Sequence, residues 1–217
     1  MFRLSVALLA VSFSASTLPS YAEDMAPAPT SGTIVDGLDL GPLAKLVGTW
    51  KTEETGGVDV APGQAQSPVG KGGVAVEPYY EVFTFEPAAG ATNASDQSLT
   101  ALYYKQEVFR KKDGAKFHDQ RGYLIYDKKN DVVYNSFCIP RAVCVVAEGK
   151  AGDVMTLETK DQGIAESNYM LNNDNTLKFS IDMDFSKDKL QYSQTTNLNV
   201  YGKPFAHKDT STLKKVS

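Results

Sequence analysis

Residues 99–149 read LTALYYKQEVFRKKDGAKFHDQRGYLIYDKKNDVVYNSFCIPRAVCVVAEG. This stretch is rich in Tyr, Phe, Val, Ile and Leu, and it is interrupted at Lys112-Asp113-Gly114, Lys128-Lys129-Asn130-Asp131 and Ile139-Pro140-Arg141. The interruptions have the chemistry of turns, because Gly and Asn tolerate positive φ and Pro fixes φ. The apolar runs between them are too short for helices and lack helical spacing. The stretch therefore predicts four antiparallel strands joined by tight turns.

Strand patterns continue on both sides of this stretch. Pro78–Glu86 alternates well, so its odd-numbered residues are expected to share one face. Further strands are expected at residues 153–160, 164–171, 176–185, 190–201 and 205–216, with turn-forming residues between them. An open sheet of about ten strands would leave unpaired edges, whereas closure removes them. We therefore predict an all-β fold, a single closed antiparallel up-and-down β-barrel of about ten strands.

The segment before the first strand predicts a cap at one end of the barrel. Gly41–Val47 has the composition of a short helical turn whose leucines pack inward, and Trp50 follows in the first strand. Thr55–Gly73 is rich in Gly, Pro and Gln without periodicity, so we expect a long loop there. Such loops in compact domains are either functional or disordered. The barrel domain is expected to span residues 41–217.

The composition limits the classes of function. The chain has 217 residues, 42% of them hydrophobic, which is enough for one domain with a sizeable core and excludes general disorder. Its formal net charge is -4, and it contains no basic run. This balance argues against nucleic acid and anionic membranes as partners, and leaves a small molecule as the expected partner.

The N-terminus predicts export. Arg3 provides the positive charge of a signal peptide, and Leu4–Ala15 provides its apolar core. Ser20-Tyr21-Ala22 matches a small-residue cleavage site. The apolar run is shorter than the ~20 residues that span a membrane. We therefore expect a signal peptide over residues 1–22, a flexible leader over 23–40, and a periplasmic or secreted protein without a membrane anchor after cleavage.

The two cysteines of the chain form a candidate disulfide. Export places Cys138 and Cys144 in an oxidising compartment, and they flank a predicted hairpin turn. Facing strands bring Cα atoms within the ~4.4–6.8 Å that a disulfide needs. Two buried thiols are the alternative. A metal site is disfavoured here, because two Cys without a nearby His do not complete a tetrahedral set.

Few residues could perform chemistry, and the two histidines are the main candidates. His118 would share a strand face with Gln120, and we interpret it as a structural, hydrogen-bonded residue. His207 would share a face with Phe205 and, in a regular strand, with Leu213. If that face is interior, the His207 imidazole can bind a metal or haem iron. An ordinary core histidine is the alternative reading of this position.

Several motifs, in order and spacing, carry a resemblance to a known family. They are Leu46-Val47-Gly48-Thr49-Trp50, residues 79–83 (YYEVF), Tyr104-Lys105-Gln106, residues 113–123 (DGAKFHDQRGY), residues 139–143 (IPRAV) with Glu148-Gly149, and residues 202–207 (GKPFAH) with Leu213-Lys214-Lys215. On these residues the chain resembles the nitrobindin family of haem-binding, calycin-type β-barrels, related in architecture to fatty-acid-binding proteins. The resemblance covers residues 43–216.

The resemblance implies a cofactor and a ligand residue. It implies haem b with ferric iron held by His207, and a role in binding nitric oxide or isomerising peroxynitrite. Trp50, Tyr104 and Phe205 are predicted to line the pocket, and Asp209 to orient the imidazole. No catalytic side chain is expected, because the cofactor carries this chemistry.

Two other classes of function stay open from the sequence. One is a lipocalin-like or fatty-acid-binding-like carrier of a small apolar ligand without haem. The other is an envelope protein whose barrel is filled by its own side chains and whose long loop contacts a partner.

Overall fold

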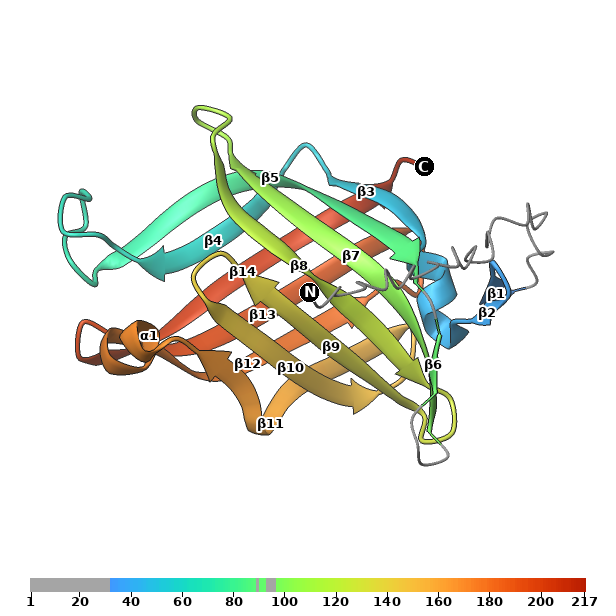
Figure 1. The fold of residues 1–217 in the computed structure, drawn as a ribbon. Coiled ribbons are helices and arrows are strands. Elements are labelled where there is room, and N and C mark those ends of the chain that lie inside the picture. Colours follow the sequence, from blue (N-terminus) through green and yellow to red (C-terminus); the bar gives the residue numbers. More distant parts are fainter. Residues whose placement is uncertain (1–31, 89, 93–96) are drawn as a thin grey trace, which may run out of the picture.

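The computed structural model describes residues 32–88, 90–92 and 97–217, and strands dominate this part of the chain (Figure 1). The barrel strands are β3 (Gly48–Thr52), β4 (Gly57–Pro62), β5 (Val74–Pro87), β7 (Ser98–Arg110), β8 (Lys116–Asp127), β9 (Val132–Ile139), β10 (Val143–Lys150), β11 (Val154–Glu166), β12 (Asp174–Asp184), β13 (Lys189–Val200) and β14 (Lys203–Lys215). The expected signal peptide and residues 23–31 of the expected leader lie outside the described residues.

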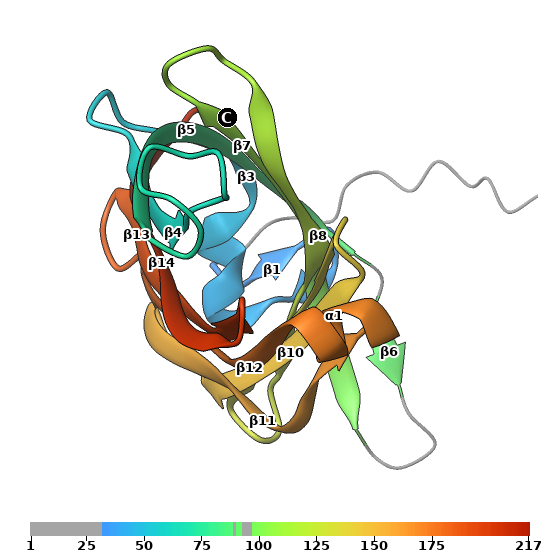
Figure 2. The same cartoon turned by 90° about the vertical axis from the view of Figure 1, so that its left-hand side faces the viewer.

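The sheet closes into a ten-stranded antiparallel barrel, which confirms the predicted fold class (Figure 2). From β5 to β13, each barrel strand pairs with the next one along the chain. β3 and β4 share one position between β5 and β14, with Leu213 opposite Thr52 in β3 and Lys208 opposite Val60 in β4. Closure by β14 satisfies the backbone groups that an open edge would expose.

One end of the barrel, which we call the η1 end, is closed by the predicted helical turn. This turn is the 3-10 helix η1 (Gly41–Leu46), and Leu43 and Leu46 on it are fully buried. Trp50 is 3% exposed, and its indole Nε1 donates a hydrogen bond of 2.7 Å to the carbonyl oxygen of Leu46. Gly41 has φ +55°, and a Cβ there would lie 2.4 Å from the Tyr126 ring, so the close approach of η1 requires glycine.

Three segments differ from the sequence-based expectations. Residues 57–62, expected in a loop, form β4. Residues 164–171, expected as a strand, divide between the end of β11 and a short helix, α1 (Asn168–Asn173), because Ser167 caps that helix by accepting a hydrogen bond from the Met170 amide. The expected leader contains a small hairpin of β1 (Ile34–Val35) and β2 (Leu38–Asp39). A further short strand, β6 (Ala91–Thr92), pairs with β7.

The opposite end of the barrel, which we call the α1 end, carries α1, the β4–β5 loop and the β13–β14 turn (Figure 1). The β9–β10 turn carries a disulfide between Cys138 and Cys144, which lie opposite each other in the strand register. Ala142 in this turn has φ +57°, the left-handed conformation that three-residue hairpin turns need. None of the helices in the described ranges has the length and apolar character that a membrane span requires.

The interior changes character along the barrel axis. Apolar side chains fill the η1 end, among them Leu213, Phe85 and Leu102, all at most 1% exposed. A polar layer follows, in which Glu81 accepts hydrogen bonds from Gln106 and Tyr192. Toward the α1 end the interior becomes partly accessible to solvent. The candidate functional residues lie in this last layer.

Candidate functional site

Strand alternation on β14 places His207 in the interior. Leu213 and Ser211 on the same face are buried, at 0% and 7% exposure, whereas the His207 side chain is 29% exposed. Phe205, two residues farther toward the α1 end, shares this face and is half-buried. The imidazole therefore lies where the filled interior gives way to solvent.

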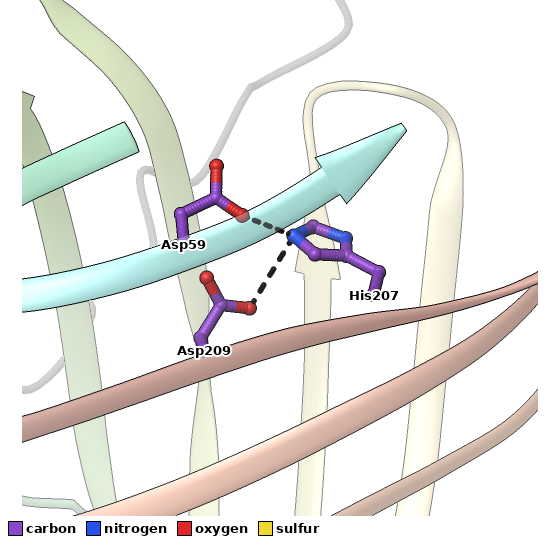
Figure 3. Close-up of side chains that lie close together, drawn as sticks. All are labelled: Asp59, His207 and Asp209. Atoms are coloured by element: carbon purple, nitrogen blue, oxygen red, sulfur yellow. Dashed lines mark hydrogen bonds and ion pairs between the residues drawn. The ribbon is translucent and has the colours of Figure 1, made fainter. Parts of the chain in front are cut away.

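Two aspartates bind the same nitrogen of His207 (Figure 3). Nε2 lies 2.7 Å from Asp59 Oδ1 and 3.5 Å from Asp209 Oδ2. Asp59 comes from β4 and Asp209 from β14, where the strand register sets them directly opposite each other. Figure 3 shows Nδ1 on the side of the ring away from both carboxylates. The closure of the barrel thus assembles an Asp–His–Asp cluster at the α1 end.

Burial and charge shift the pKa values of this cluster. Burial raises the pKa of Asp209 to about 6, and the facing Asp59 adds to this rise, while the His207 charge opposes it. Burial disfavours the charged form of His207, but the hydrogen bond that the imidazole makes to Asp59 and the charge of Asp209 outweigh it and raise the pKa of the imidazole. Gln194 donates a hydrogen bond of 2.9 Å to Asp209 Oδ2. Both shifts favour the protonated form of the group relative to the same group in water.

His118 belongs to the same region of the interior. It follows the β7–β8 turn, and its ring Nε2 is buried without a hydrogen-bond partner among the described residues. Burial lowers the pKa of His118, and the charges of His207 and Asp59 lie close enough to shift it as well. A hydrogen bond with Gln120 acts in the opposite direction on this pKa, so the interpretation of His118 as a structural, hydrogen-bonded residue stays a prediction, although Nε2 itself has no partner among the described residues.

Arg141 is a cation near this cluster. It lies in the β9–β10 turn, and its charge opposes protonation of His207. The disulfide beside it joins the two strands that flank this turn. Arg141 therefore offers a positive charge at the α1 end of the barrel.

The other predicted pocket residues occupy different positions in the barrel, and Trp50 lies far from His207. Trp50 pairs with Lys215, eight residues along β14 from His207, which corresponds to roughly 26 Å at the usual rise of a strand. The Tyr104 hydroxyl is buried, donates to Asn135 Oδ1 at 2.9 Å, and accepts from Gln120 at 2.7 Å. Phe205 alone of the three lies beside His207 in the strand.

Sequence reasoning missed Asp59 as a site residue. It lies in a segment rich in Gly and Pro, and the valines on either side of it, Val58 and Val60, point away from the interior. The polar residue is therefore inside and the apolar ones are outside, the reverse of the usual pattern. The alternation of Val58-Asp59-Val60 could have predicted a strand here. It could not have predicted that Asp59 lies on the inward face of that strand.

Comparisons with known proteins agree with this architecture. The family model described as THAP4-like, heme-binding beta-barrel domain matches residues 39–215. A solved structure, the crystal structure of Rv2717c from M. tuberculosis, superposes with a TM-score of 0.55 at 19% sequence identity, covering 81% of this chain and 95% of that one. No curated protein matches the chain. The match over almost the whole barrel shows that the chain belongs to the family of THAP4-like haem-binding β-barrel domains, as its resemblance to nitrobindins indicated.

Proposed function

We propose that this barrel binds haem b at its α1 end, with His207 as the ligand of the ferric iron. The observation that carries the proposal is the position of His207, an interior histidine on the last strand at the level where solvent reaches the ring. Family membership supports haem as the ligand class. The predicted signal peptide supports a periplasmic or secreted location for this function.

The donor chemistry around His207 fits a haem ligand. Histidines that bind metals usually hold a carboxylate or carbonyl on their other ring nitrogen, which orients the ring and raises its basicity. Asp59 makes such a bond to Nε2, and Nδ1 faces away from both carboxylates. Ligation through Nδ1 keeps this bond, whereas ligation through Nε2 requires Asp59 to release the ring. Either arrangement uses groups that the structure brings together.

The bound haem would supply the redox-active iron that binds nitric oxide or isomerises peroxynitrite. The residues of the chain would hold and orient it. His207 provides the ligand nitrogen, Asp59 and Asp209 fix the ring, and Phe205 offers an apolar face beside it. Arg141 is available as a counter-charge for the carboxylates of the porphyrin.

Titration of the purified protein with haemin tests this proposal. We expect one equivalent to bind with a shifted Soret band, and His207→Ala to weaken binding by roughly tenfold or more, about 1.4 kcal/mol, because the iron–nitrogen bond is lost. His118→Ala is the matched control and should retain the Soret shift. An unshifted Soret band in the wild-type protein, or identical spectra for wild type and His207→Ala, would refute His207 as the ligand. A lipid in the organic extract would instead support a carrier.

A further inference from the structure

We propose that Asp59, His207 and Asp209, joined by His118, form a site for a divalent first-row transition-metal ion of the zinc class. This metal site differs from the proposed haem site, because it needs no porphyrin and uses the two carboxylates as ligands. It shares His207 with the proposed haem site. The ion and haem would therefore compete for one imidazole.

The first argument is the spacing of the ligand atoms. One nitrogen or oxygen atom from each of Asp59, His207 and Asp209 can be chosen so that all three lie within 4.8 Å of one another. Ligands bound tetrahedrally at ~2.1 Å from zinc lie about 3.4 Å apart. The separations from His207 Nε2, 2.7 Å and 3.5 Å, bracket this value. Small side-chain rotations would therefore bring the three atoms around one ion.

The second argument is electrostatic. Asp59 is 7% exposed and the Asp209 side chain 15% exposed, and they face each other directly across β4 and β14. Like charges directly opposite each other on paired strands repel. A metal-bound imidazole is neutral, and two carboxylates beside it then leave a net negative site even with the nearby charge of Arg141. A divalent cation is the occupant that compensates this charge.

The third argument is His118, which is independent of the aspartates. The ring atom Nε2 of His118 is buried and has no hydrogen-bond partner in the described parts of the chain. A buried polar atom left unpaired is energetically unfavourable. His118 enters the interior from β8, near enough to His207 and Asp59 to interact with their charges. His118 lies outside the group of ligand atoms that are within 4.8 Å of one another, so its ring would have to move toward the cluster to bind the same ion.

The ligand types select the class of ion. Two imidazoles with two carboxylates suit zinc and similar first-row ions, which accept nitrogen and oxygen donors in a tetrahedral set. Calcium takes six to eight oxygen ligands and magnesium six near-octahedral ones, mostly water and carboxylate. The cluster offers too few oxygens and too much imidazole for either. Zn²⁺ is therefore the probe of choice, and Co²⁺ its spectroscopic substitute.

The test uses the full chain, purified without a histidine tag, treated with a chelator and titrated with Zn²⁺ in a calorimeter. We expect one equivalent to bind, and Asp59→Asn and Asp209→Asn each to weaken binding by roughly tenfold or more. Asp182→Asn, an exposed aspartate on the outer face of β12, is the matched control and should bind as the wild type does. Absence of stoichiometric binding, or equal affinity in all three variants, overturns the proposal.

A second measurement on the wild-type protein does not depend on the folding of variants. The chain has two histidines, so long-range ¹H–¹⁵N spectra of the imidazoles contain signals from His118 and His207 alone. Zn²⁺ should shift both sets of signals, and Co²⁺ should give visible bands typical of a four- or five-coordinate ion. Movement of neither set would mean that the ion binds adventitiously and would overturn the proposal. Haemin binding without zinc binding refutes this inference alone, and zinc binding without haemin binding refutes the haem proposal alone.

Discussion

Replacement of Trp50 by Ala should lower the free energy of unfolding by about 3–5 kcal/mol, the range for buried Trp-to-Ala changes. Trp50 is 3% exposed and closes the η1 end together with Leu46, whose carbonyl oxygen it binds at 2.7 Å. The substitution removes a large buried ring and leaves that carbonyl without its partner. Urea unfolding of the wild-type and variant proteins measures the difference.

Two control variants separate the contributions of packing and hydrogen bonding at Trp50. Trp50→Phe retains an aromatic ring and loses the indole donor, so it should cost about 1–2 kcal/mol. Tyr169→Ala removes a side chain that is 68% exposed on α1, and should change stability by less than about 0.5 kcal/mol. Because Trp50 lies far from His207, folded Trp50→Phe should bind haemin as the wild type does. If Trp50→Ala lowered the free energy of unfolding by less than 1 kcal/mol, the buried, hydrogen-bonded position of Trp50 at the η1 end would be contradicted.

Glu81 should make the protein less stable as the pH rises toward 7. Glu81 is 1% exposed, and burial raises the pKa of its carboxyl from the usual 4.5 to about 7, although hydrogen bonds from Gln106 and Tyr192 oppose this rise. The folded state therefore keeps a proton that the unfolded chain has already lost. The stabilising effect is complete below pH 4.5, declines between pH 4.5 and 7, and is absent above pH 7, a change of roughly 3 kcal/mol.

Glu81→Gln should remove this part of the pH dependence. The variant keeps a neutral polar side chain at the position, so its advantage over the wild type should grow from pH 5 to pH 8 in urea unfolding. Glu107→Gln is the control, because the hydrogen bond from Lys116 lowers the pKa of Glu107 and places its titration below this range. The pKa of Asp209, about 6, lies in the same window, and the difference between wild type and Glu81→Gln removes the part of its effect that both proteins share. Parallel pH profiles for wild type and Glu81→Gln would contradict the prediction.

Local sequence patterns predicted most of the barrel correctly, because each strand carries its own signal. Alternation in Pro78–Glu86 predicted which residues of β5 share a face, and Tyr79, Glu81 and Phe83 are indeed the buried ones. Alternation also placed His207 on the face of Leu213, and the structure has both inside. Such patterns are local, and they do not depend on which strand lies beside which.

The errors arose where the local signal was ambiguous. An apolar run, Tyr169, Met170 and Leu171, favours a strand. These residues instead form part of α1, whose first turn is capped by Ser167. In β4, Asp59 points inward while Val58 and Val60 do not, so the apolar positions mark the outer face. Tertiary pairing with β5 and β14 overrides the weak local preference of this segment.

The sequence by itself determined the class of architecture and placed His207 on the same strand face as Leu213, since turn chemistry and period-two alternation act over a few residues. It left open whether that face is interior. Only the tertiary structure decided what His207 meets there. Asp59 lies 148 residues away along the chain, and the register between β4 and β14 sets it beside the imidazole and opposite Asp209. That register follows from the closure of the whole sheet, in which the pairing of every strand fixes the position of the last one.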